Sequence, residues 1–160
     1  MDTADRLSRL FGPLRRALLR SIRRSGEVPD VPESQFELLR ALPESGTVTP
    51  RAVAAQLRLA PPTVSNLVKS MTTAGLVART PDPNDLRTVG LSLTPRATQL
   101  LDSYNRISAS ILNQALNDLS AADRRTLHGA LPALERLLAA LERLDSTAPK
   151  SEPPSPTHKP

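Results

Sequence analysis

The sequence predicts a mainly helical fold with one small β-hairpin, and three observations support this class. The 160 residues are 39% apolar but include only two Phe, one Tyr and no Trp. Leu, Val, Ile and Ala must therefore supply the core, and such residues suit helix packing better than a β-sandwich. Apolar residues recur at spacings of three and four along several stretches, as they do on one face of a helix. Around residues 89–93 apolar residues instead alternate with small ones, which indicates a strand.

The first 25 residues predict a helix, and the linker that follows it contains turn residues. Pro13 interrupts the pattern, because a proline inside a helix removes a hydrogen bond and clashes with the preceding turn. Two alternatives follow: the helix kinks at Pro13, or it begins near Gly12–Pro13. Its apolar stripe consists of Leu7, Leu10, Phe11, Leu14, Leu18 and Ile22.

Two short helices are predicted next, separated by an extended segment. The first covers residues 34–42 and ends before Pro43, and the extended segment covers residues 46–49. Thr49 is suited to cap the second helix, with Pro50 at its first position. This helix is expected to end near Leu57.

A third helix and a hairpin complete the middle of the chain. The helix is expected to run from Pro61 to about Ala74, with Gly75 as its C-terminal stop. Residues 76–80 are predicted as a strand, and residues 89–93 as the strand that returns beside it. The buried face of the helix is predicted to consist of Val64, Leu67, Val68 and Met71.

Two long helices are predicted after the hairpin. Thr94-Pro95 repeats the signal of a capping residue followed by proline, and Ser120 with Asp123 resembles a capping box. Pro132 lies within the last helix and predicts a kink. Residues 145–160 are rich in proline and nearly free of apolar residues, so we expect a disordered tail. The stripe of the last helix consists of Leu127, Leu131, Leu134, Leu138 and Leu141.

The positive charge is concentrated in two segments. The formal net charge is +5, residues 1–25 hold seven Arg against two Asp, and residues 51–96 hold six bases against two acids. Between them, residues 26–50 hold one Arg and five acids. Two basic zones make a polyanion the obvious candidate partner. A solvated, Arg-rich helix face would explain the same charges.

The composition also excludes several classes of site. The chain contains no Cys and two His, so we expect no disulfide, no metal site and no thiol switch. A Gly-rich phosphate loop, a paired-carboxylate motif and a nucleophile elbow are missing, so we expect neither an enzyme nor a cofactor. No apolar run is long enough for a membrane span and no charged-then-apolar leader opens the chain. We therefore expect a cytoplasmic protein that does not bind a membrane.

The order of the predicted elements is typical of a winged helix-turn-helix. The helix that begins at Pro61 would be the recognition helix, because its polar residues lie outside the apolar stripe. Asn66 can pair with adenine in the major groove, and Lys69 can contact phosphate. A solvated polar helix face is the alternative. The candidate DNA-binding residues are Pro61, Pro62, Thr63, Ser65, Asn66, Lys69 and Ser70.

Residues 33–97 resemble the MarR family of bacterial transcription regulators, and the flanking helices extend the resemblance over nearly all of residues 5–144. Each motif is weak alone, but four of them occur in register over about sixty residues. The motifs are Ser34-Gln35-Phe36-Glu37-Leu38-Leu39, Ala60-Pro61-Pro62-Thr63-Val64-Ser65-Asn66-Leu67-Val68, Ala74-Gly75-Leu76-Val77-Ala78-Arg79, and Asp82-Pro83-Asn84-Asp85-Leu86-Arg87 followed by Leu93-Thr94-Pro95.

The turn between the two predicted strands carries a second candidate DNA contact. Arg87 on a narrow ribbon fits the minor groove, whose negative potential attracts Arg. Asp85 can hold that side chain, and MarR-like proteins commonly have this Asp-x-Arg pair. A surface salt bridge between the two residues is the alternative. Leu86 stands where the family often has a second basic residue, and it keeps open a winged-helix module that binds protein without specific DNA readout.

The terminal helices carry more apolar surface than the winged segment can bury alone, so we expect them to form the base of a homodimer. We divide the chain into residues 1–32 (dimerisation helix and linker), 33–94 (winged helix-turn-helix), 95–144 (dimerisation helices) and 145–160 (tail). Such a dimer would set two recognition helices about 34 Å apart on a palindrome of double-stranded DNA.

The resemblance implies a repressor that a small anionic or phenolic ligand releases from its operator. The ligand would bind between the helical base and the DNA-binding lobe. The residues expected near that crevice are Arg15, Phe36 and Tyr104. All three also suit an ordinary packing role, and the absence of Cys excludes the peroxide sensing that some relatives use.

Overall fold

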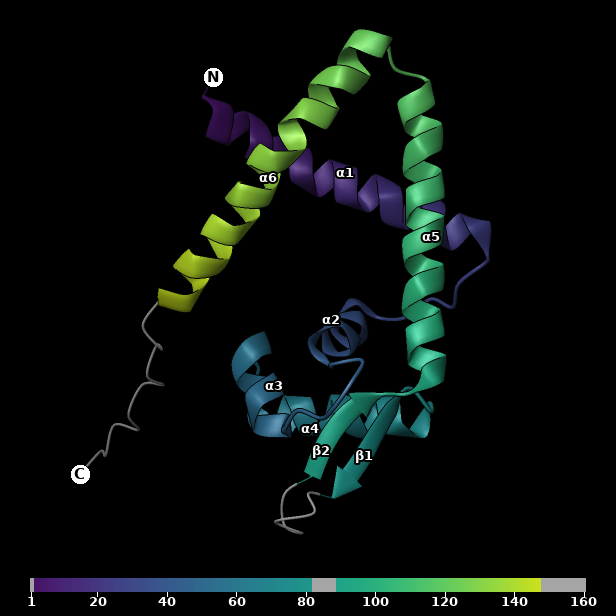
Figure 1. The fold of residues 1–160 in the computed structure, drawn as a ribbon, viewed down its shortest axis with the longest axis vertical. Helices are drawn as coiled ribbons and strands as arrows, with labels where there is room; N and C mark the ends of the chain where they lie inside the picture. Colours follow the sequence, from purple (N-terminus) through teal and green to yellow (C-terminus); the bar gives the residue numbers. More distant parts are fainter. Residues whose placement is uncertain (1, 82–88, 148–160) are drawn as a thin grey trace, which may run out of the picture. The chain divides into compact units, whose positions relative to one another are not determined.

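The computed structural model describes residues 2–81 and 89–147 of the chain. Within these residues it is mainly helical with one antiparallel hairpin, as the sequence predicts (Figure 1). Two compact units divide the chain between Gln114 and Ala115. The elements are α1 (Thr3–Ser25), α2 (Glu33–Ala41), α3 (Pro50–Leu57), α4 (Pro61–Thr73), β1 (Val77–Pro81), β2 (Val89–Leu93), α5 (Pro95–Asn117) and α6 (Ala121–Thr147).

Helix α1 begins well before its proline. The Asp2 carboxylate caps the helix by accepting a hydrogen bond from the Thr3 N–H at 2.7 Å. The helix then continues through Pro13, so the alternative start near Gly12–Pro13 is wrong. Ile22, near the C-terminal end, is the buried residue of this helix, whereas Leu10, Phe11 and Leu14 are exposed.

Local capping defines the boundaries of α3 and α4, as predicted. The Thr49 hydroxyl accepts a hydrogen bond from the Ala52 N–H at 3.2 Å, and Pro50 occupies the first turn of α3. Arg58 ends α3 in the left-handed conformation, with a φ of 52°. Helix α4 starts with two prolines and ends before Gly75, whose φ of 71° favours a residue without a Cβ.

The hairpin pairs Val77 with Leu93 and Pro81 with Val89, so β1 starts and ends one residue later than predicted. The segment expected to be extended at 46–49 joins this sheet through Val48. Val48 and Leu91 exchange two backbone hydrogen bonds of 2.9 and 2.8 Å. The chain passes so close here that a Cβ on Gly90 would lie 2.5 Å from the Thr47 Cβ.

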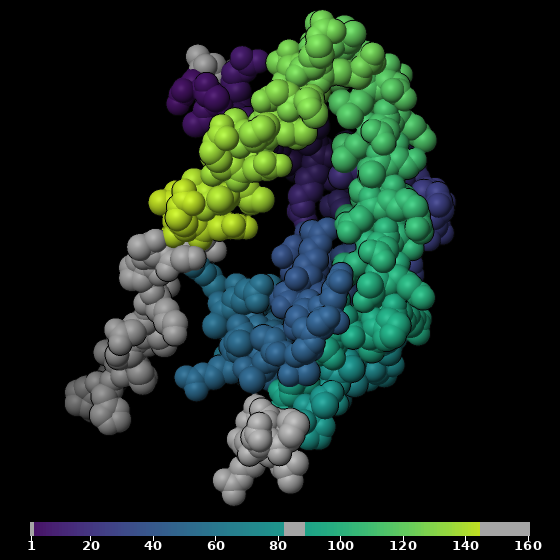
Figure 2. All heavy atoms as spheres, in the orientation of Figure 1, coloured from purple at the N-terminus to yellow at the C-terminus, as the bar shows by residue number. Residues whose placement is uncertain are grey.

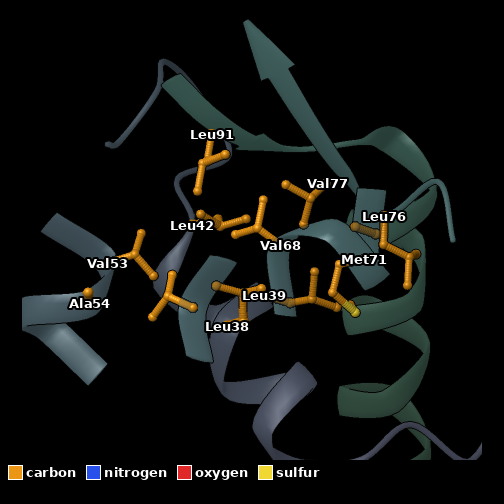
Figure 3. Close-up of a cluster of buried hydrophobic side chains, with 12 residues drawn as sticks. Leu38, Leu39, Leu42, Val53, Ala54, Val68, Met71, Leu76, Val77 and Leu91 are labelled. Carbon is orange, nitrogen blue, oxygen red and sulfur yellow. The ribbon is translucent and has the colours of Figure 1, made fainter. Parts of the chain in front are cut away.

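One apolar core unites α2, α3, α4, the hairpin and the start of α5 (Figure 3). Leu38 and Leu39 from α2, Val53 from α3, Met71 from α4 and Leu91 from β2 are fully buried. We call this part of the chain, residues 33–97, the winged module. Figure 2 shows α3, in blue, on its surface.

The second unit contains the end of α5 and helix α6. The predicted start of α6 at Ser120 is confirmed: the Ser120 hydroxyl accepts from the Asp123 N–H at 3.1 Å and donates to the Asp123 carboxylate at 2.6 Å. The Arg124 guanidinium donates to the Leu119 carbonyl at 2.8 Å. Helix α6 includes Pro132 and extends to Thr147, three residues into the expected tail. The rest of that tail, residues 148–160, lies outside the described residues.

Candidate nucleic-acid interface

Helix α4 has one buried and one exposed face. Val64, Val68 and Met71 are buried at spacings of four and three, and they pack in the core shown in Figure 3. This apolar contact fixes which side of the helix faces solvent. All seven residues predicted for DNA contact are exposed: Pro61, Pro62, Thr63, Ser65, Asn66, Lys69 and Ser70.

The N-terminus of α4 offers few backbone donors. Pro61 and Pro62 have no N–H group. The N–H groups of Thr63 and Val64 both donate to the Ala60 carbonyl, at 2.9 and 3.2 Å. A phosphate near this end would therefore be bound by side chains, which is unlike the usual anion site formed by the backbone of a helix N-terminus.

Further exposed cations lie on other elements of the winged module. Arg51 lies in the first turn of α3, Arg79 on β1 and Arg96 in the first turn of α5. All three belong to the basic segment 51–96, but the sequence pattern does not single them out. Their charge is visible in the sequence, whereas their exposure depends on how the helices pack.

The two wing residues, Asp85 and Arg87, lie outside the described residues. Their flanks are described: β1 ends at Pro81 and β2 begins at Val89, and the two residues pair with each other. The alternative suggested by Leu86 falls in the same segment. The role of Asp85 and Arg87 in DNA contact therefore stays a prediction.

The structure brings two of the three predicted ligand-pocket residues together. The rings of Phe36 on α2 and Tyr104 on α5 lie 4.5 Å apart between centroids, tilted by 48°. The Arg40 guanidinium stands 5.8 Å from the Tyr104 ring centroid, at cation–π distance. Phe36 is buried, which agrees with a packing role.

A cavity of about 90 Å³ adjoins this aromatic pair, within the first unit. Its charged lining residues are Arg23, Arg40, Asp30 and Glu33, and Arg15 does not line it. Arg15 instead forms an ion pair with Glu33, and Arg23 forms one with Asp30 at 3.1 Å. Sequence reasoning missed Arg23 and Arg40, because the cavity forms only where α1, the linker after it and α2 come together.

Other classes of site find no support in the part of the chain that the structure describes. Its Asp, Glu and His side chains form no group of three that could hold a metal ion. Among residues 2–81 and 89–147, the helices are too short or too polar to cross a membrane.

Known proteins resemble this chain in sequence and in fold. The HTH-type transcriptional regulator Mb0904 of Mycobacterium bovis is 30% identical over 113 residues, which are 71% of this chain and 79% of the relative. The structure of Rv1404 from Mycobacterium tuberculosis superposes with a TM-score of 0.69 at 21% identity, over 85% of this chain and 94% of that one. FabT of Streptococcus pneumoniae, solved in complex with DNA, superposes with a TM-score of 0.64 at 18% identity, over 88% of this chain and 99% of that one.

A family model places the winged region within one family. The model described as MarR family matches residues 30–88, which include α2, α3, α4 and β1. Mb0904, which matches 71% of this chain, is named an HTH-type transcriptional regulator. The structural neighbours share the helical fold with a hairpin. The chain therefore belongs to the MarR family of helix-turn-helix transcriptional regulators and is not an enzyme.

Proposed function

We propose that this regulator is a homodimeric repressor that binds a palindromic operator in double-stranded DNA. The observation that carries the proposal is the exposed polar face of α4, opposite a face that is fully packed in the core. The hairpin follows this helix directly, as in winged DNA-binding modules. FabT was solved in complex with DNA and a MepR variant of S. aureus bound to an oligodeoxyribonucleotide, which supports the same partner for this chain.

Side-chain chemistry on α4 supports direct reading of base edges. Asn66 is exposed one turn after the helix start and can donate to and accept from one adenine. Thr63 and Ser70 lie on the same side, three residues before and four residues after it. Lys69 adds a charge suited to a phosphate. Arg51, Arg79 and Arg96 are further exposed cations of the winged module.

Exposed leucines support the dimer. Among the described residues, the large apolar side chains that remain exposed in the single chain lie in α1, in α6 and at the end of α5 and the turn after it. Leu14 is 55% exposed and Leu138 is 58% exposed. Apolar stripes of this kind mark surfaces that a partner covers. A second copy related by a two-fold axis would cover them and present two α4 helices to one palindrome.

The test starts from a DNA site selected out of a random pool with the purified full-length chain. Asn66→Ala should weaken binding by about fivefold to 150-fold and relax the preference at one base pair. Lys69→Ala should weaken all sequences alike and lower the slope of log affinity against log salt by about one. Asn105→Ala, at an exposed position on α5, is the matched control and should bind like wild type.

The outcome also decides between the two candidate functions. Weak binding without sequence preference in the wild type would favour a winged module that binds protein. A monomer by light scattering, at 17.3 kDa and not twice that mass, would contradict the two-fold arrangement. Repression is tested separately, by placing the selected site upstream of a reporter gene.

A small aromatic anion is the ligand that best fits the cavity beside Phe36 and Tyr104. Arg23 and Arg40 supply positive charge and the two rings supply stacking surface. The cavity of about 90 Å³ is smaller than the roughly 300–1,000 Å³ of typical ligand sites, so a ligand must widen it. It must also compete with Asp30 for Arg23, because these two residues form an ion pair.

Benzoate is a suitable probe of this part of the proposal. It should release the wild type from its operator, and Arg40→Ala should need more benzoate for the same release. Arg136→Ala, an exposed arginine on α6, is the control. An equal response of all three proteins would place benzoate elsewhere.

A further inference from the structure

Thr94 lies where β2 ends and α5 begins, and its side chain makes two hydrogen bonds to different elements. The hydroxyl donates to the Gly75 carbonyl at 2.7 Å. The same oxygen accepts from the Ala97 N–H at 3.2 Å, which caps α5. The Thr94 backbone N–H donates to the Leu76 carbonyl at 3.2 Å. Thr94 therefore connects the start of α5 with the two residues that terminate α4.

Two backbone hydrogen bonds terminate α4 next to Thr94. The Gly75 N–H donates to the Thr72 carbonyl at 3.0 Å and the Leu76 N–H donates to the Met71 carbonyl at 2.9 Å. These bonds satisfy carbonyls of the last helical turn, as in a glycine-terminated helix. The Gly75 carbonyl lies beyond that turn, and the Thr94 hydroxyl is its partner.

A hydroxyl suits this position chemically, because a single oxygen makes both bonds. Ser and Thr can donate one hydrogen bond while accepting another at short range. An ionised Asp could still cap α5 but could not donate to the Gly75 carbonyl. Valine has the shape of threonine and could make neither bond.

We propose that Thr94 is a positioning residue for DNA recognition, because it fixes the direction of α4 relative to α5. This inference rests on the proposed function, in which α4 reads DNA and α5 belongs to the dimer base. Through Thr94, the hydrogen bond to Gly75 would set how far apart the two α4 helices of a dimer stand. The spacing between operator half-sites would then depend on a residue that contacts no DNA.

The geometry of α4 makes this position sensitive. The helix has 13 residues and is therefore about 20 Å long. Thr94 contacts Gly75 just beyond its C-terminal end, and Asn66 lies toward its N-terminal end. A tilt of about 5° at the C-terminal end would move the opposite end by about 2 Å. Hydrogen bonds to base edges tolerate only a few tenths of an ångström, from about 2.7 to 3.2 Å.

The experiment compares Thr94→Ser, Thr94→Asp and Thr94→Val on the selected operator and on operators with the half-site spacing changed by one base pair. The measured quantity is the ratio of affinities for the original and changed spacings. Thr94→Ser should keep the wild-type ratio. Thr94→Asp and Thr94→Val should each lose about tenfold in affinity for the original spacing, and their ratios should fall toward one.

Thr49→Val is the matched control for lost stability. The Thr49 hydroxyl also caps a helix, with the same 3.2 Å distance to a backbone N–H, but within the described residues this bond stays inside α3. Thermal unfolding should show a loss for both variants, larger for Thr94→Val because it removes two hydrogen bonds and Thr49→Val removes one. Only Thr94→Val should change the spacing ratio, which a purely structural role would leave unchanged.

Two results would overturn the inference. Wild-type spacing ratios in both Thr94→Asp and Thr94→Val would reduce Thr94 to a simple helix cap, while the proposed function would stand. If Thr94→Asp does not fold, the comparison of Thr94→Val with Thr49→Val decides alone. Failure of the wild type to bind any selected site would instead refute the proposed function, and the inference with it.

Discussion

The winged module and the terminal helices use the same residue, leucine, in opposite ways. In the module, Leu38, Leu39 and Leu91 are completely buried. In α6, which belongs to the second unit, Leu131 and Leu138 are 49% and 58% exposed. The winged module therefore buries its leucines within itself, whereas these leucines of α6 are about half exposed.

The physical reason lies in the number of elements that surround each leucine. Three short helices and a hairpin surround the core of the module on several sides, so a small stretch of chain buries a complete core. An isolated amphipathic helix can bury its stripe only against another element. Substitutions of leucine in the two regions should therefore have different consequences.

The largest effect is expected for Leu138→Arg on α6. If this leucine is buried between two copies, each dimer loses it twice, at about 1.5–3 kcal/mol per side chain. The dimer dissociation constant should rise by roughly 10² to 10⁴. Sedimentation over a range of concentrations measures this change, with Arg125→Ala as the control. An unchanged dimer would remove this part of α6 from the interface.

Leu39→Ala should destabilise the module by about 2–5 kcal/mol, because it leaves a cavity at a position that is 0% exposed. Denaturant unfolding measures the loss, and Leu39→Met should lose less than about 1.5 kcal/mol. The shift caused by Leu39→Ala should be the same at low and high protein concentration. A shift that follows the monomer–dimer equilibrium would contradict a self-contained module.

Gly90→Ala should cost about 1–3 kcal/mol, because the added Cβ would overlap Thr47 and push the segment 46–49 off the sheet. Gly129 on α6 is the contrasting glycine, since no described atom outside its own stretch of helix backbone lies within 4 Å of a Cβ placed there. Gly129→Ala should stabilise its helix by up to about 1 kcal/mol. Thermal unfolding should show a lower midpoint for Gly90→Ala and a higher one for Gly129→Ala. Equal changes in midpoint would contradict the close approach at Gly90.

The smallest effects are expected from the helix caps, and they should be alike in the two regions. Thr49→Ala and Ser120→Ala each remove one side-chain bond to a backbone N–H, of 3.2 and 3.1 Å. Each should cost about 1 kcal/mol, because a cap acts within its own helical turn. Thr49→Ser and Ser120→Thr should restore most of the loss. A much larger cost at either site would show that the hydroxyl also supports packing.

The features predicted best from the sequence are those that depend on neighbouring residues. The starts of helices at Thr49, Thr94 and Ser120 are confirmed by their hydrogen bonds. The buried and exposed faces of α4 also follow the predicted periodicity. These features are local because a cap spans three residues and a helical face repeats every three or four.

The features predicted less well depend on contacts between distant segments. Pro13 allowed two starts for α1, and the structure places the start at Thr3. Arg15 was expected near the ligand crevice, which stays a prediction: it pairs with Glu33, a lining residue of the cavity that Arg23 and Arg40 line directly. Nothing in the spacing of these arginines distinguishes them, because the cavity depends on how α1 meets the linker and α2.

By itself, the sequence determined the mainly helical class, the positions of the caps and the polar face of α4. Each of these follows from the chemistry of a few consecutive residues. Only the tertiary structure decided that Val48 joins the hairpin, that Phe36 packs against Tyr104, and that Thr94 reaches Gly75, 19 residues away in the chain. Such contacts depend on how the packed core brings distant backbone segments together, and no local pattern records that arrangement.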